Sequence, residues 1–303
     1  MATPLIEDPL FERLIDPQAP IENLGSGCVW SEGPAWIPRQ QAVIWSDIPS
    51  NRIMRWTETG GVEIDRTNVG FTNGRTLDLD SRLVVCSHGH RRIERVEHDG
   101  TITALATHYQ GARLNSPNDV VVKSDGSIWF TDPPYGILSD GEGDATESEL
   151  SGCFVFRFEP ASGVLTVATD LLVHPNGLAF SVDESILYAS DTSRSIDPAG
   201  NHHIMAFDVE GDSSLTNPRV FAEISPGLAD GFRVDRTDHV FTSAEDGIHV
   251  LTPEGRRIGK IPLPEVTSNC VFGGPEGNDL FITASTSLYR VRTKTTGASR
   301  PLP

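Results

Sequence analysis

Short runs of apolar residues alternate with polar turns along almost the whole chain, and six of these runs follow a similar polar dipeptide. The clearest copy has Asn118-Asp119, an apolar run at 120–122, a turn at 124–126 and a second apolar run at 128–130. The six copies begin at Glu32, Asn73, Asn118, Asn176, Asp230 and Asn269. Repeats of roughly 40–60 residues built from short strands are typical of a β-propeller. The pattern therefore predicts an all-β fold, a six-bladed β-propeller whose repeated positions meet at a central site.

A third apolar run completes each repeat. These runs are residues 52–56, 92–96, 153–157, 203–207, 247–250 and 287–291. We expect residues 1–28 to form a polar preface with a short helix near 10–15, residues 29–295 a single propeller domain, and residues 296–303 a C-terminal tail. A strand at 28–31 is expected to close the ring against the last blade, because an unpaired sheet edge is a liability.

The order of strands within a repeat predicts which residues surround the central site. If the dipeptide starts the innermost strand on one face of the disc, the second strand returns to that face. The second strands end at Asp47, His88, Asp132, Asp191 and Glu245. Two insertions, 136–149 and 193–201, follow second strands and should lie at the same mouth. They are either mobile surface loops or a rim over the site.

Charge and cysteine content narrow the class of protein. A net charge of −18 argues against nucleic-acid binding, since little would neutralise phosphates. The acidity fits solubility, with attraction of a cation as the alternative. The cysteines Cys28, Cys86, Cys153 and Cys270 form no CxxC motif and are expected as buried thiols in a reducing cytosol. Without a signal-peptide pattern or a membrane-length apolar run, we expect a soluble cytoplasmic protein, and the sequence indicates no oligomeric state.

Four of the six repeated positions carry side-chain oxygens that suit a metal ion. Glu32, Asn118, Asn176 and Asp230 supply two carboxylates and two amide carbonyls. An all-oxygen set favours Ca²⁺ first and Mg²⁺ or Mn²⁺ next, whereas Zn²⁺, which usually selects imidazole or thiolate, is a weaker possibility. The alternative is that Asn-Gly and Asp-Gly pairs only form turns. Asn73 and Asn269 hold the same position in the other two repeats. We expect them either to contact substrate or water, or to have a structural role in turns and packing.

Several motifs together resemble a known family. They are Ser31-Glu32-Gly33-Pro34, Ser116-Pro117-Asn118-Asp119, Thr131-Asp132-Pro133-Pro134-Tyr135-Gly136, His174-Pro175-Asn176-Gly177-Leu178 and Asp230-Gly231-Phe232-Arg233-Val234-Asp235. Their order and spacing, from about residue 29 to 291, are similar to the gluconolactonase and senescence-marker-protein (regucalcin-like) family, most closely its bacterial gluconolactonase branch. The resemblance implies a propeller with a central divalent metal that hydrolyses small-molecule sugar lactones to aldonic acids without an organic cofactor.

The resemblance also implies roles for individual residues. Glu32, Asn176 and Asp230 match the family's metal ligands, Asp230 matches its catalytic acid/base, and Asn118 matches a residue that touches metal or substrate. This chain departs from the animal members at Ser116, where they have a substrate-binding arginine. Their substrate-contacting glutamate falls near Tyr135–Gly136 here.

Substrate contacts are therefore expected from other residues at the mouth. Besides Asn73 and Asn118, we expect His88, Asp132 and Tyr135 to bind sugar hydroxyls, with a turn-forming role as the alternative for Asp132. Two other functions stay open. One is a phosphotriesterase-like hydrolase of the diisopropyl fluorophosphatase type, which needs a more apolar pocket. The other is a non-catalytic calcium-binding propeller, since propellers often serve as platforms.

Overall fold

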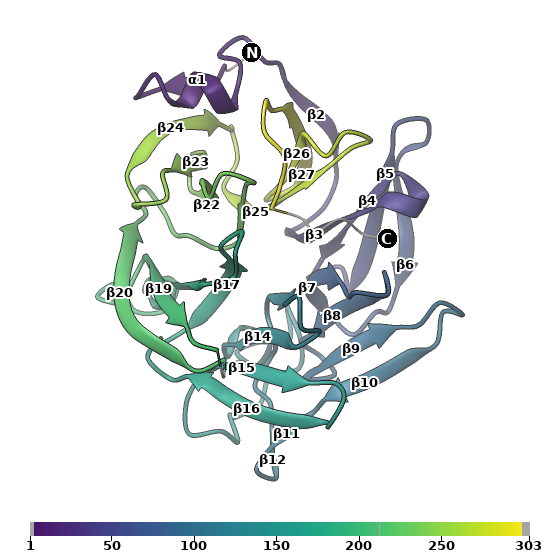
Figure 1. The fold of residues 1–303 in the computed structure, drawn as a ribbon. Helices are drawn as coiled ribbons and strands as arrows, with labels where there is room; N and C mark the ends of the chain where they lie inside the picture. Colours follow the sequence, from purple (N-terminus) through teal and green to yellow (C-terminus); the bar gives the residue numbers. More distant parts are fainter. Residues whose placement is uncertain (1–2, 212, 299–303) are drawn as a thin grey trace.

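Six sheets stand around a common centre in the computed structural model, which describes residues 3–211 and 213–298 (Figure 1). Blade one comprises β3 (Ser31–Ile37), β4 (Ala42–Asp47), β5 (Arg52–Thr57) and β6 (Gly61–Thr67). Blade two comprises β7 (Thr72–Leu77), β8 (Leu83–Ser87), β9 (Arg92–Val96) and β10 (Ile102–Ala106). Blade three comprises β13 (Val120–Val122), β14 (Ile128–Asp132), β15 (Phe154–Glu159) and β16 (Val164–Thr169).

The remaining three blades follow in chain order. Blade four comprises β17 (Pro175–Phe180), β18 (Ile186–Asp191), β19 (His203–Val209) and β20 (Leu215–Glu223). Blade five has β21 (Phe232–Val234), β22 (Val240–Ala244), β23 (Gly247–Leu251) and β24 (Arg257–Pro262), and blade six has β25 (Thr267–Gly273), β26 (Asp279–Ala284) and β27 (Ser287–Arg292). All pairings within the blades are antiparallel. The predicted six-bladed, all-β fold and its third strands are confirmed.

The N-terminal segment belongs to the propeller. Strand β2 (Ile21–Ser26) pairs with β27 and completes blade six, and β1 (Leu5–Ile6) adds a fifth strand to blade five. Between them, helix α1 (Phe11–Leu14) buries Phe11 and Leu14 in the core between blades five and six. The closing strand is therefore β2 rather than the expected strand at 28–31, and much of the segment expected as a polar preface pairs or packs with blades five and six. The true closing strand has no fully buried residue, so its sequence lacks a clear apolar alternation.

One apolar cluster fills the space between each pair of neighbouring blades. The cluster between blades three and four, for example, contains Trp129 and Val155 from one blade and Leu178 and Leu187 from the other. Equivalent clusters occur at the other five blade interfaces. Packing of this kind holds the blades together without help from the centre of the disc, because the hydrophobic effect scales with the apolar area buried.

Smaller elements occupy the connections. They are a hairpin of β11 (His108–Tyr109) and β12 (Ala112–Arg113), and the short 3₁₀ helices η1 (Pro38–Gln40), η2 (Tyr135–Ile137) and η3 (Ser193–Ser195). Of these, η2 and η3 lie in the segments after the second strands of blades three and four. All four cysteines are free thiols, and three are buried as expected, whereas Cys153 is half-buried. Within the described residues, no helix has the length and apolarity needed to cross a membrane.

Candidate active site and metal centre

The repeated polar residues lie where the innermost strands begin, and the strand register is irregular there. The pairing of β3 with β4 shifts between Glu32 and Ala35, and that of β17 with β18 shifts between Pro175 and Leu178. In blades three and five the innermost strand starts only after the polar residue. A β-bulge turns a side chain away from the regular alternation of a strand, which is why bulges are common beside active sites. Here the irregularity frees these side chains to face the central cavity.

Glycine follows the polar residue in most blades because neighbouring blades approach closely at this level. The N–H of Gly74 donates to the carbonyl of Asn118 at 2.8 Å, and the N–H of Gly177 donates to the carbonyl of Asp230 at 2.9 Å. A Cβ atom at either glycine would collide with the backbone of the residue that accepts its hydrogen bond. The small residue thus lets the backbone of one blade fix the position of a site residue in the next.

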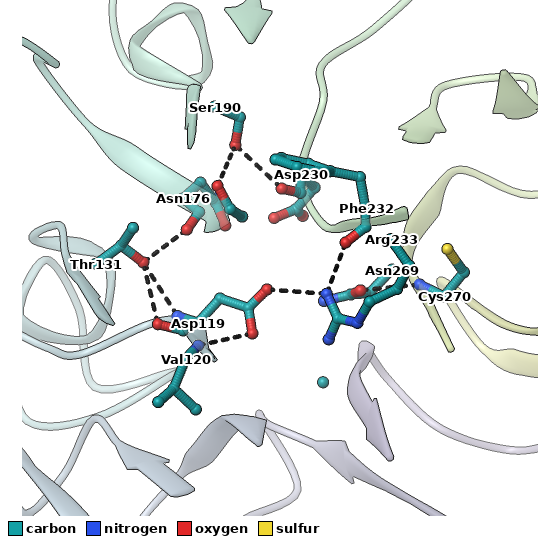
Figure 2. A network of polar contacts seen from close by, with 12 residues as sticks. Asp119, Val120, Thr131, Asn176, Ser190, Asp230, Phe232, Arg233, Asn269 and Cys270 are labelled. Atoms are coloured by element: carbon teal, nitrogen blue, oxygen red, sulfur yellow. Dashed lines mark hydrogen bonds and ion pairs between the residues drawn. The ribbon is translucent and has the colours of Figure 1, made fainter. Parts of the chain in front are cut away.

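Hydroxyl groups from the second strands hold the same backbone, a feature that the sequence analysis missed. Thr131 Oγ1 donates to the carbonyl of Asn176 at 2.6 Å, and Ser190 Oγ donates to that of Asp230 at 3.2 Å (Figure 2). Ser243 Oγ accepts from the N–H of Asp230 at 2.8 Å. The signal was readable, because a serine or threonine occupies this position in five of the six second strands, with Cys86 in blade two.

One cavity of about 410 Å³ collects most of the predicted site residues. Its lining includes Glu32, Asn73, Asn118, Asn176 and Asp230 from five different blades, together with Tyr135. His88 and Asp132 do not line it. The convergence of residues nearly 200 positions apart follows from the repeat, since equivalent positions of a propeller share one axis.

Glu32 presents an unsatisfied oxygen in this cavity. The side chain is 4% exposed, and its Oε2 accepts hydrogen bonds from the N–H of Gly33 and from Asn269 Nδ2, the latter at 3.2 Å. Its Oε1 is buried without a hydrogen-bond partner. A buried carboxylate oxygen without a partner carries a desolvation cost that a bound cation would offset. The donor set and this orphaned oxygen both fit a divalent metal.

The side chain of Asn176 also has an oxygen that could bind a metal ion. Its Nδ2 donates to Thr192 Oγ1 at 3.1 Å, which leaves the amide Oδ1 available as a ligand. Among the described residues, no group of three or more His, Cys, Asp or Glu is placed to hold a metal ion. A metal centre here therefore depends on amide oxygens as well as carboxylates, as Ca²⁺ sites commonly do.

The two carboxylates of the set share a buried environment. Burial, and then the charge of Asp230, raise the pKa of the Glu32 carboxyl well above its usual range. Burial, followed by the charges of Asp119 and Glu142, raises the pKa of Asp230, whereas contact with Asn176 opposes that rise. Like charges brought together in this way disfavour joint ionisation unless a cation lies between them.

An ion pair lies next to this set and was not predicted. Asp119 Oδ2 and Arg233 Nη1 are 3.4 Å apart, and Arg233 also donates to the carbonyl of Phe232 at 2.7 Å (Figure 2). Arg233 lines a second cavity, of about 650 Å³, that opens among the innermost strands. The pair joins blades three and five across the central axis.

His88 supports the cavity wall from behind. Its side chain is 1% exposed, with Nε2 3.3 Å from Asn73 Nδ2 and Nδ1 3.1 Å from the carbonyl of Glu142. The carbonyl only accepts, so Nδ1 carries the proton and Nε2 accepts from the amide. Burial lowers the pKa of His88 to about 4, so the ring is neutral at pH 7. The expected sugar contact is replaced by a bridge between Asn73 and the 136–149 insertion.

Asp132 is fully buried and serves the backbone. Its Oδ2 accepts from the N–H of Asn115 at 2.8 Å, and its Oδ1 is buried without a hydrogen-bond partner. Asp191 accepts in the same way from the N–H groups of Val173 at 2.8 Å and His174 at 3.2 Å. Neither the substrate role nor the turn-forming role expected for Asp132 describes this arrangement. Buried N–H groups need acceptors, and the second-strand aspartate supplies one to the loop that enters its own blade.

Replacing Asp132 by Ala is therefore expected to destabilise the fold rather than to change substrate preference. The buried N–H of Asn115 would lose its acceptor, which costs roughly 1–3 kcal/mol. Urea unfolding should show the loss as a lower midpoint. Asp170→Ala, at an exposed position, is the matched control. A variant of unchanged stability with a raised KM would instead restore the substrate role.

Tyr135 joins the two insertions at the cavity. Its hydroxyl lies 2.5 Å from Thr192 Oγ1, and Ser195 Oγ donates to it at 3.3 Å. Burial raises the pKa of Tyr135 to about 12. Glu142 from the first insertion and Ser195 from the second line the cavity beside it. The insertions therefore form part of the cavity wall, which favours their interpretation as a rim.

Comparisons with known proteins agree with this geometry. The family model described as "SMP-30/Gluconolactonase/LRE-like region" matches residues 30–286. A gluconolactonase of Zymomonas mobilis subsp. mobilis is 35% identical over 311 residues, covering 95% of this chain and 85% of that protein. A solved gluconolactonase from Xanthomonas campestris is 39% identical with a TM-score of 0.90, covering 96% of this chain and 95% of that one.

A more distant solved structure shares the fold. Regucalcin from Agrobacterium tumefaciens, described as a calcium-binding protein, has a TM-score of 0.71 at 16% identity, covering 89% of this chain and 94% of that one. The family match covers most of the chain, and it agrees with the resemblance that the ordered motifs indicated. The chain belongs to the SMP-30/gluconolactonase/LRE-like family.

Proposed function

We propose that the protein hydrolyses a sugar lactone of the gluconolactone type to its aldonic acid, with a divalent cation held by Glu32, Asn118, Asn176 and Asp230. The observation that carries the proposal is the convergence of these four oxygen-bearing side chains on one cavity, where Glu32 Oε1 has no partner. Relatives named as gluconolactonases support the substrate class. Ca²⁺ is the proposed ion, because the set is all oxygen and a protein of the same fold binds calcium.

The proposed ligands have different roles in the reaction. Glu32 and Asn176 are held by hydrogen bonds to neighbouring groups and orient the site. When bound, the cation supplies Lewis-acid activation of the lactone carbonyl. Asp230, which is more exposed than Glu32 and lines the cavity, takes the proton of the attacking water. A ligated carboxylate is a weak base, which suffices because lactones are reactive esters.

The cavity wall offers both polar and apolar groups to a lactone ring. Blades two to four contribute polar groups such as Asn73, Thr192 and Ser195, which suit hydroxyls. Blades one, five and six contribute the carboxylates Glu32, Asp230 and Glu245, and also an apolar surface formed by Trp30, Ile48, Leu228, Ala244 and Val266. This apolar surface also favours the second candidate, a phosphotriesterase-like hydrolase. The unpaired cysteines suit the reducing cytoplasm that we propose as the location.

A pH-indicator assay separates these functions. Protein freed of cations with chelator is refilled with Ca²⁺, Mg²⁺, Mn²⁺ or Zn²⁺ and offered glucono-1,5-lactone, pentonolactones, δ-valerolactone and diisopropyl fluorophosphate. We expect turnover of sugar lactones above the spontaneous rate, greatest with Ca²⁺. Cleavage of the fluorophosphate alone would favour the second candidate, and no turnover with any ion would rule out both.

A further inference from the structure

The charges that line the cavity are all of one sign. Among the described residues of its lining, four carry carboxylates and none is lysine, arginine or histidine. The four are Glu32, Glu142, Asp230 and Glu245. A site that received a phosphorylated or sulfonated sugar would be expected to offer a cationic partner for that group, because burying an unpaired anion is costly.

The four carboxylates lie at different depths. Glu32 is buried among the proposed ligands, whereas Glu142 is half-buried and Glu245 is exposed. Glu142 comes from the insertion after β14, and its backbone is held by His88. Glu245 follows the end of β22, with its N–H donating to the carbonyl of Pro226 at 3.1 Å. These two residues therefore stand at the mouth, on blades three and five.

The carboxylates at the mouth are close enough to the proposed ligands to affect the binding of a charged substrate. Glu142 and Asp230 line the same cavity of about 410 Å³, so the charge of one carboxylate acts on groups bound beside the other. A divalent cation would balance Glu32 and Asp230 and leave the charges of Glu142 and Glu245 unbalanced. A substituent at the carbon farthest from the lactone carbonyl points back toward this mouth when the carbonyl lies at the ligand set.

We propose that Glu142 and Glu245 form a charge filter that selects uncharged lactones and rejects those bearing phosphate, sulfonate or a second carboxylate. The inference rests on the proposed lactone hydrolysis and assigns its substrate class. The reaction that supplies such a substrate must oxidise the anomeric carbon of a free, unphosphorylated aldose. Any phosphorylation of the acid product must then follow hydrolysis. The product is itself an anion, so the same charges favour its release.

The test compares glucono-1,5-lactone with its 6-phosphate in wild type, Glu142→Gln, Glu245→Gln and the double variant, at constant free Ca²⁺. The measured quantity is the ratio of kcat/KM for the neutral over the anionic lactone, corrected for spontaneous hydrolysis. We expect a ratio of at least about tenfold in wild type, falling severalfold in each variant and further in the double variant, since a tenfold ratio needs only ~1.4 kcal/mol. Raising the salt should also lower the ratio, because the Debye length is about 10 Å at 0.1 M.

Glu147→Gln is the matched control, because it removes the same charge from an exposed position of the same insertion outside the cavity lining. Its ratio should equal that of wild type. A wild-type ratio near one, or a ratio unchanged in the double variant, would overturn the filter while leaving lactone hydrolysis intact.

A binding readout separates the filter from catalysis. Gluconolactam and its 6-phosphate keep the ring but resist hydrolysis, so calorimetry measures their affinities with and without Ca²⁺. The phosphorylated lactam should bind at least about tenfold more weakly to wild type, and the double variant should narrow the difference. Equal affinities would overturn the filter. Discrimination between the lactams without turnover of either lactone would instead retain the filter and overturn the proposed hydrolysis.

Discussion

Replacing Asp230 by Asn is expected to lower kcat for a sugar lactone by about 10²-fold or more, the range for loss of a general base. The variant keeps one side-chain oxygen and loses the charge and the basic group. The fold should survive, because the hydrogen bonds that hold residue 230 use its backbone N–H and carbonyl with Ser243, Gly177 and Ser190. The measurement is kcat at saturating Ca²⁺, with circular dichroism as the check on folding.

Asn176→Ala provides the comparison. It removes a proposed ligand without touching the base, so its defect should lie mainly in cation affinity and should be partly rescued by excess Ca²⁺. Asp230→Asn should bind Ca²⁺ more weakly yet remain slow at saturation. If both variants showed partial losses of equal size that excess Ca²⁺ restored, Asp230 would be a ligand only.

Removal of the divalent cation is expected to abolish lactone turnover while leaving the propeller folded. The proposed ligands lie at the starts of the innermost strands, whereas the apolar clusters between blades hold the structure. Cation-free protein should therefore retain its circular dichroism spectrum. Re-addition of Ca²⁺ should raise Tm by mass action, with about 2.7 kcal/mol of stabilisation at a hundredfold excess over Kd.

The two effects must occur together for the proposal to hold. Activity and the rise in Tm should follow the same Ca²⁺ titration, since one site accounts for both. The double variant of Glu32→Gln and Asp230→Asn should lose both responses. Full turnover in the presence of a strong chelator would show that the reaction does not use the cation.

The sequence repeat explains why most of the fold could be predicted from the sequence. Six equivalent dipeptides fix six blades, and equivalence around an axis brings Glu32 and Asp230 to one cavity without knowledge of any loop. Asp132 shows that the repeat predicts the position of a residue but not the direction of its side chain. A polar residue at a strand end sits on the predicted face, yet its side chain turns toward whichever buried N–H groups lack an acceptor. That choice depends on the path of the preceding loop, which a periodic pattern does not encode.

Residues outside the repeat were beyond prediction for a different reason. Strand order places the insertion 136–149 at the mouth, but Glu142 has no counterpart in another blade, so the sequence does not single it out as a residue of the cavity lining. The closing strand β2 was missed because an exposed outer strand needs little apolar character. The hydroxyls of Thr131 and Ser190, by contrast, recur at equivalent positions of other blades, so their pattern is present in the sequence.

The contact between the first and last blades affects the order in which the protein folds and acquires its site. Asn269 Nδ2 holds Glu32 Oε2 across 237 positions of sequence, and β2 pairs with β27 over a similar separation. Contacts between distant segments form late in folding. The chain must first lose the entropy of closing a long loop before such contacts can stabilise it. Blades two to four can assemble from local pairings, while the Glu32 side of the site waits for the ring to close. Refolded protein should thus regain its β-sheet signal before it regains Ca²⁺ binding, and the interval between the two would time the closure of the ring.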